Sequence, residues 1–268
     1  MVLEKIMTPI ALFDSGIGGL SVLHQAQKIL PHESFVYFAD TACVPYGTKS
    51  KETVSLCVEK AVEQLATLPI KALVVACNTA TSITIKPLRL KYDFPIIGME
   101  PAVKPAIERN RLLNKRVLVL ATPLTLQQDK YNSLVTELDR EDVVDAFPLP
   151  ELVQYCEQLT FDEDKISTYL REKLQNLDLS TYSTVVLGCT HYPYYKKIFK
   201  ALMGSSVEII DGNIGTVKHL KSILASAQLL ATSKPSTTSE VTFLSSYDKV
   251  ETARRCRKAL HYLSAQQI

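Results

Sequence analysis

Two of the six cysteines stand where an apolar run ends and polar residues begin. Cys77 follows the run 73–76, and Cys189 follows the run 185–188. The residues directly after them are Asn78 and Thr79 in the first case, and Thr190 and His191 in the second. A cysteine at the amino end of a helix has a thiol pKa lowered from about 8.5 toward neutrality, which lets it exchange protons near physiological pH. His191 is close enough in sequence to Cys189 to add positive charge or to carry a proton.

The presence of two such cysteines indicates the kind of reaction. A cysteine protease or amidase needs one cysteine with an activating histidine, and a disulfide oxidoreductase needs two cysteines close together. Inversion of a carbon centre instead needs two acid–base groups on opposite faces of a planar intermediate. Thiols suit this task because each can act as a base in one direction and as an acid in the other. We therefore predict stereochemical inversion, with Cys77 and Cys189 as the proton-transfer residues.

The other cysteines are expected to be small, buried apolar side chains. The sequence contains no C-x-x-C pair and no H-x-H or H-E-x-x-H pattern, so we predict no metal site. A disulfide framework is not expected in a chain of this size and composition. Cys43, which comes shortly before Pro45-Tyr46-Gly47, is expected to pack rather than to react.

The chain alternates short apolar runs with longer amphipathic ones, which is typical of parallel sheets with helices on both faces. We expect strands at 10–13, 35–38, 73–75, 95–97, 117–120, 143–147, 185–187, 207–210 and 241–244. We expect helices at 20–30, 53–66, 165–174, 216–230 and 248–263. A patch rich in Pro, Ser and Thr, 232–239, is expected to be a loop. The predicted fold class is α/β.

The expected strand ends repeat with similar spacing in the two halves of the chain. They fall at Asp14, Asp40, Cys77 and Gly98 in the first half, and at Thr122, Pro148, Cys189 and Asp211 in the second. We therefore predict two pseudo-symmetric α/β domains, one made of 1–98 plus 212–268 and the other of 99–211. Ligands of open α/β sheets bind beyond the carboxyl ends of the strands, so both cysteines should line one cleft between the domains.

Two loops offer groups for a substrate. Asp14-Ser15 begins a turn that is rich in glycine, and its N–H groups can bind an anion. The Asp14 carboxylate fits a ligand that carries an ammonium group as well as a carboxylate. The turn has neither G-x-G-x-x-G nor G-K-[ST] spacing, which argues against a dinucleotide. In the second loop, Pro45-Tyr46-Gly47 can hold a rigid turn that presents the N–H groups of Tyr46 and Gly47 to a carboxylate.

Composition excludes several other functions. The 268 residues carry a net charge of +2, with 46% hydrophobic and 22% charged residues. This is typical of a globular chain and gives no broad electrostatic surface for nucleic acid or an anionic membrane. No apolar run approaches the roughly 18 residues of a spanning helix, and the apolar stretch within 1–13 is too short for a secretory signal. We expect a cytoplasmic protein with no nucleic-acid or membrane partner.

Five segments resemble, in order and spacing, the signature motifs of bacterial glutamate racemases. They are Asp-Ser-Gly-Ile-Gly-Gly at 14–19, Pro-Tyr-Gly at 45–47, Cys-Asn-Thr-Ala at 77–80, Glu-Pro-Ala at 100–102 and Gly-Cys-Thr-His-Tyr-Pro at 188–193. The resemblance implies that L- and D-glutamate are interconverted without a cofactor, between two facing α/β domains. The product D-glutamate would serve peptidoglycan synthesis. The substrate would be the only small-molecule partner, and dimers are common in the family.

The resemblance also implies roles for individual residues. Cys77 and Cys189 would transfer the protons, with Cys77 serving the D-enantiomer. The residues that would line the substrate are Asp14, Ser15, Tyr46, Gly47, Asn78, Thr79, Thr190 and His191. Thr122 and Thr125 match a threonine pair that closes the site in the family.

The sequence departs from the family pattern beyond these threonines. Gln128 stands where a serine is usual, and Phe147-Pro148 replaces Cys-Pro. The stretch 150–154, which includes Glu151 and Gln154, leaves open which residue replaces a glutamate often found nearby. These departures concern supporting contacts and regulation rather than the reaction.

Three other functions remain as alternatives. An aspartate racemase of the same superfamily would share the cysteines and differ in reach, although Asp14-Ser15 together with 189–192 favours glutamate. A module that binds an amino acid as a sensor would not need two cysteines. A single-cysteine amidase would release ammonia and would lose activity on replacement of only one cysteine.

Overall fold

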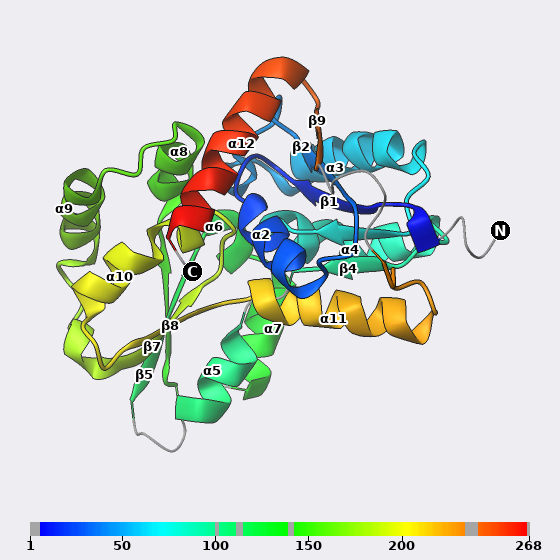
Figure 1. Cartoon of the computed structure of the whole chain (residues 1–268). Coiled ribbons are helices and arrows are strands. Elements are labelled where there is room, and N and C mark those ends of the chain that lie inside the picture. Colours follow the sequence, from blue (N-terminus) through cyan, green and yellow to red (C-terminus); the bar gives the residue numbers. More distant parts are fainter. Residues whose placement is uncertain (1–5, 100–101, 111–114, 139–141, 234–240, 267–268) are drawn as a thin grey trace.

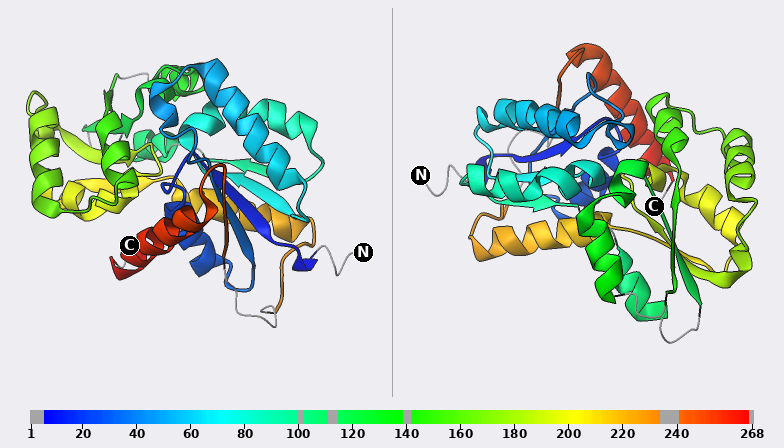
Figure 2. Two further views of the ribbon diagram at one scale, coloured as in Figure 1. Left: turned by 90° about the horizontal axis from the view of Figure 1, so that it is seen from above. Right: turned by 180° about the vertical axis from the view of Figure 1, so that it is seen from behind.

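The computed structural model describes residues 6–99, 102–110, 115–138, 142–233 and 241–266, which form two parallel sheets flanked by helices (Figure 1). Figure 2 shows the two sheet-and-helix units side by side. The predicted α/β class with two parallel sheets is confirmed. Part of the Glu-Pro-Ala motif at 100–102 and most of the loop expected at 232–239 lie outside the described residues.

The first sheet has five parallel strands in the order β4-β3-β1-β2-β9. In that order they are Ile96–Gly98, Ala72–Val75, Ile10–Asp14, Phe35–Ala39 and Thr242–Ser245. One face is covered by α2 (Leu20–Ile29), α11 (Asn213–Ser226) and α12 (Lys249–Ala265), and the other by α3 (Lys51–Ala66) and α4 (Asn78–Lys91). Ile10 and Leu12 pack on the first face, and Ala11 and Phe13 pack on the second. Burial on both faces explains the continuous apolar run of β1.

The second sheet has four parallel strands in the order β6-β5-β7-β8. In that order they are Val144–Pro148, Arg116–Ala121, Tyr182–Leu187 and Glu208–Asp211. One face is covered by α8 (Pro150–Glu157), α9 (Glu163–Leu174) and α10 (Lys196–Met203), and the other by α5 (Val103–Asn110) and α7 (Asp129–Leu138). Short helices complete the chain: η1 (Tyr46–Thr48), α6 (Pro123–Leu126), η2 (Leu179–Thr181) and η3 (Tyr192–Tyr195).

Every strand expected from the sequence overlaps a strand of the structure. The last of them, β9, pairs with β2 and so returns to the first sheet. The first sheet therefore combines strands from the first 98 residues with one from the C-terminal region, and the second uses strands between 116 and 211. The division into 1–98 plus 212–268 and 99–211 stays a prediction. None of the helices in the described ranges combines the length and apolar character needed to cross a bilayer.

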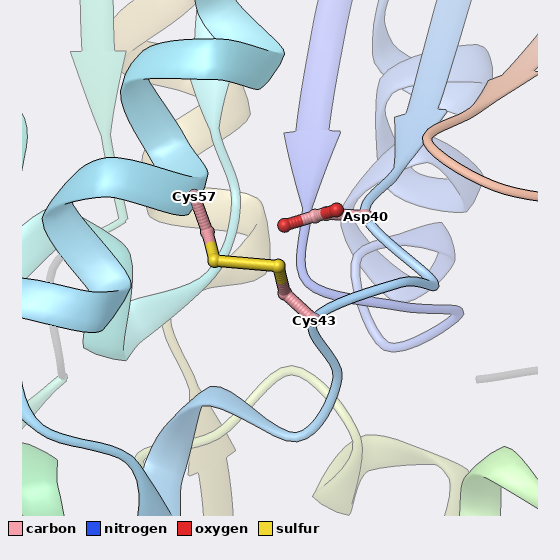
Figure 3. A group of neighbouring side chains, drawn as sticks. All are labelled: Asp40, Cys43 and Cys57. Carbon is pink, nitrogen blue, oxygen red and sulfur yellow. A yellow bond between two sulfur atoms is a disulfide. The ribbon is translucent and has the colours of Figure 1, made fainter.

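Cys43 packs against the core as expected, but the sequence analysis did not foresee that it is part of a disulfide. Cys43 and Cys57 are joined by a disulfide across a sequence separation of 14 residues, with 6.7 Å between their Cα atoms (Figure 3). The loop after β2 turns back over the beginning of α3, and this brings the two residues together. Their spacing in the sequence carries no sign of that turn. The other four cysteines, which are Cys77, Cys156, Cys189 and Cys256, are free and buried.

Candidate active site

The order of strands creates one switch point in each sheet. From β1 the chain places β2 on one side and β3 on the other, and from β5 it places β6 on one side and β7 on the other. The residues at or just beyond the ends of the two central pairs of strands are Asp14 and Cys77 in the first unit, and Thr122 and Cys189 in the second. Open α/β sheets bind their ligands at such points. The local duplication read from the sequence thus places one cysteine at each switch point.

Hydrogen bonds show that the two switch points face each other. Thr79 Oγ1 in α4 lies 3.0 Å from Thr122 Oγ1 and 2.9 Å from Thr125 Oγ1. Thr122 directly precedes α6, and Thr125 lies within that helix. The Thr190 hydroxyl, beyond β7, donates to Asp14 Oδ2 at 3.1 Å. Residues from both units therefore meet here, among them Thr122 and Thr125, to which the family resemblance gives the role of closing the site.

Cys77 precedes α4, and its sulfur accepts a hydrogen bond from the Ala80 N–H at 3.5 Å. The thiol also donates to Ser15 Oγ at 3.9 Å. The helix-start position is as expected, but the expected lowering of the pKa is wrong. Burial, reinforced by the negative charge of Asp14, raises the pKa of the Cys77 thiol well above its ordinary value. The lost hydration of a thiolate at this site outweighs the favourable helix end, so Cys77 rests as a protonated thiol.

Cys189 lies beside a histidine that is itself held by a carboxylate. Its Sγ is 3.6 Å from His191 Nδ1, and His191 Nε2 is 2.8 Å from Glu157 Oε1. Burial opposes protonation of His191, but the hydrogen bonds to Cys189 and Glu157 prevail and raise the pKa of the imidazole well above its ordinary value. The two cysteines therefore have different neighbours: Cys189 lies beside an imidazole whose pKa is raised, whereas Cys77 lies beside Ser15 and the amino end of α4.

Glu157, at the end of α8, is the functional residue that the sequence analysis missed. Besides holding His191, its Oε1 accepts the Ile17 N–H at 2.8 Å. Arg255 of α12 donates to the backbone carbonyl of Glu157 and, at 3.1 Å, to its Oε2. Burial alone would raise the pKa of Glu157, but hydrogen bonds and charge from His191, with further help from Ile17 and Arg255, lower it. Glu157 is therefore an ionised carboxylate that ties the first unit to the second.

Glu151, one of the residues that the sequence analysis left open for this role, is engaged elsewhere. Glu151 faces the surface side of α8, where it accepts hydrogen bonds from Tyr169 at 2.9 Å and Lys173 at 2.7 Å. One sequence signal would have identified the right residue. Glu157 lies four positions after buried Val153 and so shares its helix face, where an acidic residue needs a partner.

Asp14 closes β1 with a carboxylate that is fully buried. Its Oδ1 accepts the Gly16 N–H at 3.1 Å, and its Oδ2 accepts the Thr190 hydroxyl at 3.1 Å. Burial raises the pKa of Asp14 from 3.8 to about 6. The turn that follows approaches the second unit closely, since a Cβ on Gly18 would lie 2.5 Å from His191 Nδ1. The glycine-rich turn therefore lets the two units approach each other closely, in addition to providing N–H donors.

Replacing Asp14 with asparagine is expected to stabilise the fold at neutral pH and to impair activity. Because burial raises the pKa of Asp14 from 3.8 to about 6, the native state binds this proton more tightly than the unfolded chain does. Stability therefore falls as pH rises through that window, by about 3 kcal/mol in total. The neutral amide avoids this loss. Urea unfolding of both proteins near pH 4 and near pH 7 checks the prediction, which fails if the gain is the same at both.

Tyr46 and Gly47 lie in η1, between the two units. The Tyr46 hydroxyl donates to Asp40 Oδ2 at 2.5 Å, which fixes the loop to the end of β2. Gly47 packs directly on the second unit, because a Cβ there would lie 2.4 Å from Thr122 Cβ. This loop therefore bridges the first unit and the threonine cluster that closes the site.

The predicted site residues are all buried, so the structure shows an enclosed site. The side chains with at most 7% exposure are Asp14, Ser15, Tyr46, Cys77, Asn78, Thr79, Thr122, Cys189, Thr190 and His191. A cavity of about 750 Å³ reaches the site at Glu157, between the loop at Val44 and Pro45 and the arginines 254 and 255 of α12. Burial of these side chains strengthens the charge interactions among them.

The described residues contain one group compact enough to hold a metal ion. It consists of Asp40, Cys43 and Cys57, whose potential ligand atoms lie within 4.8 Å of one another. The two sulfurs of this group form the disulfide. This group does not include Cys77 or Cys189.

Comparison with known proteins agrees with this geometry. A family model for Asp/Glu/Hydantoin racemase matches residues 20–220. Glutamate racemase from Halothermothrix orenii is 52% identical over 254 residues, covering 95% of this chain and 98% of that protein. Glutamate racemase 2 from Bacillus subtilis is 51% identical over 241 residues, covering 90% and 89%. The crystal structure of glutamate racemase isoform RacE1 from Bacillus anthracis superposes with a TM-score of 0.81 at 31% identity, covering 95% of this chain and 94% of that one.

A second solved structure contains a substrate. Escherichia coli glutamate racemase in complex with L-glutamate and the activator UDP-MurNAc-ala superposes with a TM-score of 0.78 at 28% identity. The match covers 96% of this chain and 95% of that one.

Proposed function

Because this chain belongs to the Asp/Glu/hydantoin racemase family, we propose that it interconverts L-glutamate and D-glutamate by proton transfer between Cys77 and Cys189. The observation that carries this proposal is the pair of cysteines at two facing switch points, each in a different electrostatic setting. The relatives at about half identity carry the name glutamate racemase, which favours glutamate over aspartate.

In the proposed reaction one sulfur is a thiolate and the other a thiol. With Cys189 as the base, its thiolate takes the α-proton, and the carbon becomes planar with its charge spread onto the carboxylate. The Cys77 thiol then donates its proton to the opposite face and becomes a thiolate. The reverse direction uses the same groups with their roles exchanged, so neither direction consumes an oxidant or a reductant.

The surrounding residues support this assignment. The amide groups of Tyr46–Gly47 and Asn78–Thr79 can receive the substrate carboxylates and the charge that develops on the planar intermediate. In the turn 15–19, the N–H groups of Gly16 and Ile17 are already hydrogen-bonded to Asp14 and Glu157. Each well-placed donor of this kind contributes roughly 3–4 kcal/mol in other enzymes. The buried Asp14 carboxylate is the candidate partner of the substrate ammonium group, which would lower the pKa that burial has raised.

The proposal also includes a setting for the enzyme. D-glutamate is a component of bacterial peptidoglycan, so we place the protein in the cytoplasm, where the precursors of that polymer are made. Its partner is the amino acid substrate, and a homodimer is the proposed assembly.

Racemisation is expected to need neither pyridoxal phosphate nor a metal, because both proton carriers are side chains. Pure protein should interconvert the enantiomers after treatment with hydroxylamine and EDTA, as followed by circular dichroism starting from D-glutamate. D-Aspartate and L-alanine serve as comparison substrates, and a pyridoxal-phosphate racemase treated in parallel is the positive control for the reagents. Loss of activity that pyridoxal phosphate or a metal restores would contradict the proposal.

A further inference from the structure

The disulfide between Cys43 and Cys57 lies outside the proposed chemistry and in a distinctive position. Both residues are partly buried, whereas the four free cysteines are buried. Figure 3 shows the bond linking the loop after β2 to α3, with one carboxylate oxygen of Asp40 directed toward the sulfurs. Small thiols and disulfides in solution can reach this pair more readily than they can reach the buried thiols.

The ring closed by this bond contains the loop that bridges the two units. Between Cys43 and Cys57 lie Tyr46 and Gly47, which are proposed to bind substrate. The Tyr46 hydroxyl is hydrogen-bonded to Asp40, which lies three residues before Cys43, and Gly47 packs on Thr122 of the other unit. The bond thus fixes both ends of a segment whose middle contributes to the enclosed site.

We infer that Cys43 and Cys57 form a reversible dithiol–disulfide site that adjusts substrate binding, an inference that rests on the proposed function. In the cytoplasm disulfides are usually transient and serve redox sensing rather than permanent bracing. Opening the bond lets the loop sample more conformations, and ordering it again on binding then weakens affinity for the substrate. The proton-transfer groups themselves are untouched, so the effect falls on KM rather than on kcat.

The exchange balances with a low-molecular-weight disulfide as the oxidant. One of the two cysteines attacks it as a thiolate, forms a mixed disulfide and releases the first small thiol. The second cysteine attacks the protein sulfur of that mixed disulfide, closes the bond between Cys43 and Cys57 and releases the second small thiol. The protein loses two electrons and two protons, and the small disulfide is reduced to two thiols.

The test compares the wild-type protein with the Cys43→Ser/Cys57→Ser double variant, each treated with glutathione disulfide or with dithiothreitol. Thiols are counted after unfolding, and racemisation is followed by circular dichroism. Of the six cysteines, four should react in the oxidised wild type and six in the reduced one. The double variant should show four in both states, which makes it the control for oxidation of the catalytic thiols.

Reduction of the wild type is expected to raise KM for glutamate on the order of tenfold with little change in kcat. The double variant should resemble the reduced protein and should not respond to either reagent. Equal KM values for both states of an active wild type would overturn the inference and leave the proposed function standing. Six reactive thiols after oxidation, together with retention of added Zn²⁺ that Asp40→Ala abolishes, would overturn it in favour of a metal site. A redox-dependent thiol count without racemisation in any sample would overturn both proposals.

Discussion

Replacing either Cys77 or Cys189 with serine is expected to lower racemisation by several orders of magnitude. Every turnover needs a base on one face of the α-carbon and an acid on the other, so the loss of one thiol stops inversion. A serine hydroxyl has a pKa far above that of a thiol and is a much weaker base. Circular dichroism of D-glutamate measures the loss. Cys256→Ala, which removes a buried thiol of α12, is the control and should stay close to the wild type.

The two serine variants should differ in the exchange that they retain. A protein with one working thiol can still remove and return the α-proton on that face. It should therefore exchange deuterium from D₂O into one enantiomer of glutamate without inverting it. The family resemblance assigns the D-enantiomer to Cys77, so the Cys189→Ser variant should label D-glutamate and the Cys77→Ser variant should label L-glutamate. Proton NMR of each enantiomer with each variant gives the four rates.

The structure adds an asymmetry to this experiment. Cys189 lies beside His191, which Glu157 holds in place and whose pKa is raised, whereas burial raises the pKa of Cys77 itself. The variant that keeps Cys189 should thus exchange faster than the variant that keeps Cys77. Deuterium entering both enantiomers equally, or near-normal racemisation by both variants, would mean that a single base such as His191 does the work.

The central strands were predictable from the sequence because they are buried on both faces. Such strands appear as unbroken apolar runs, and β1, β3, β5 and β7 could therefore be located to within a few residues. Because Cys77 and Cys189 follow the ends of β3 and β7, locating these ends was enough to place both cysteines at the carboxyl edges of the sheets. The threonine contacts across the site followed from the family resemblance rather than from any pattern of spacing.

The features that the sequence analysis missed depend on distances between segments. Cys43 and Cys57 meet because a loop turns back over α3, and Glu157 meets His191 because of the rotation of α8 about its axis. The raised pKa of Cys77 depends on the depth of its burial, which competes with the helix end. Local sequence shows that Cys77 stands at a helix end but not how deeply it is buried, and so it predicted the wrong direction for the pKa shift.

Replacing Glu157 with glutamine is expected to reduce kcat/KM on the order of a hundredfold, as the loss of a group that supports acid–base catalysis typically does. The amide keeps the size and can still accept the Ile17 N–H, so the local contacts persist. It removes the negative charge that holds a proton on His191, and burial then lowers the pKa of that imidazole. Without the imidazolium, Cys189 loses the charged group beside its sulfur.

The pH profile separates this role from a merely structural one. Because the pKa of His191 falls without the Glu157 carboxylate, the descending limb of kcat/KM, above which this imidazole is neutral, should move to lower pH in Glu157→Gln. The equilibrium constant between enantiomers is one, so kcat/KM must fall equally for L- and D-glutamate, and a mismatch would reveal an error in the assay. Glu151 lies on the same helix but accepts hydrogen bonds from Tyr169 and Lys173 instead. The Glu151→Gln variant is therefore the matched control and should keep the wild-type pH profile. A loss of activity in Glu157→Gln without a shift of that limb would show that Glu157 supports the packing of the two units and not the protonation of His191.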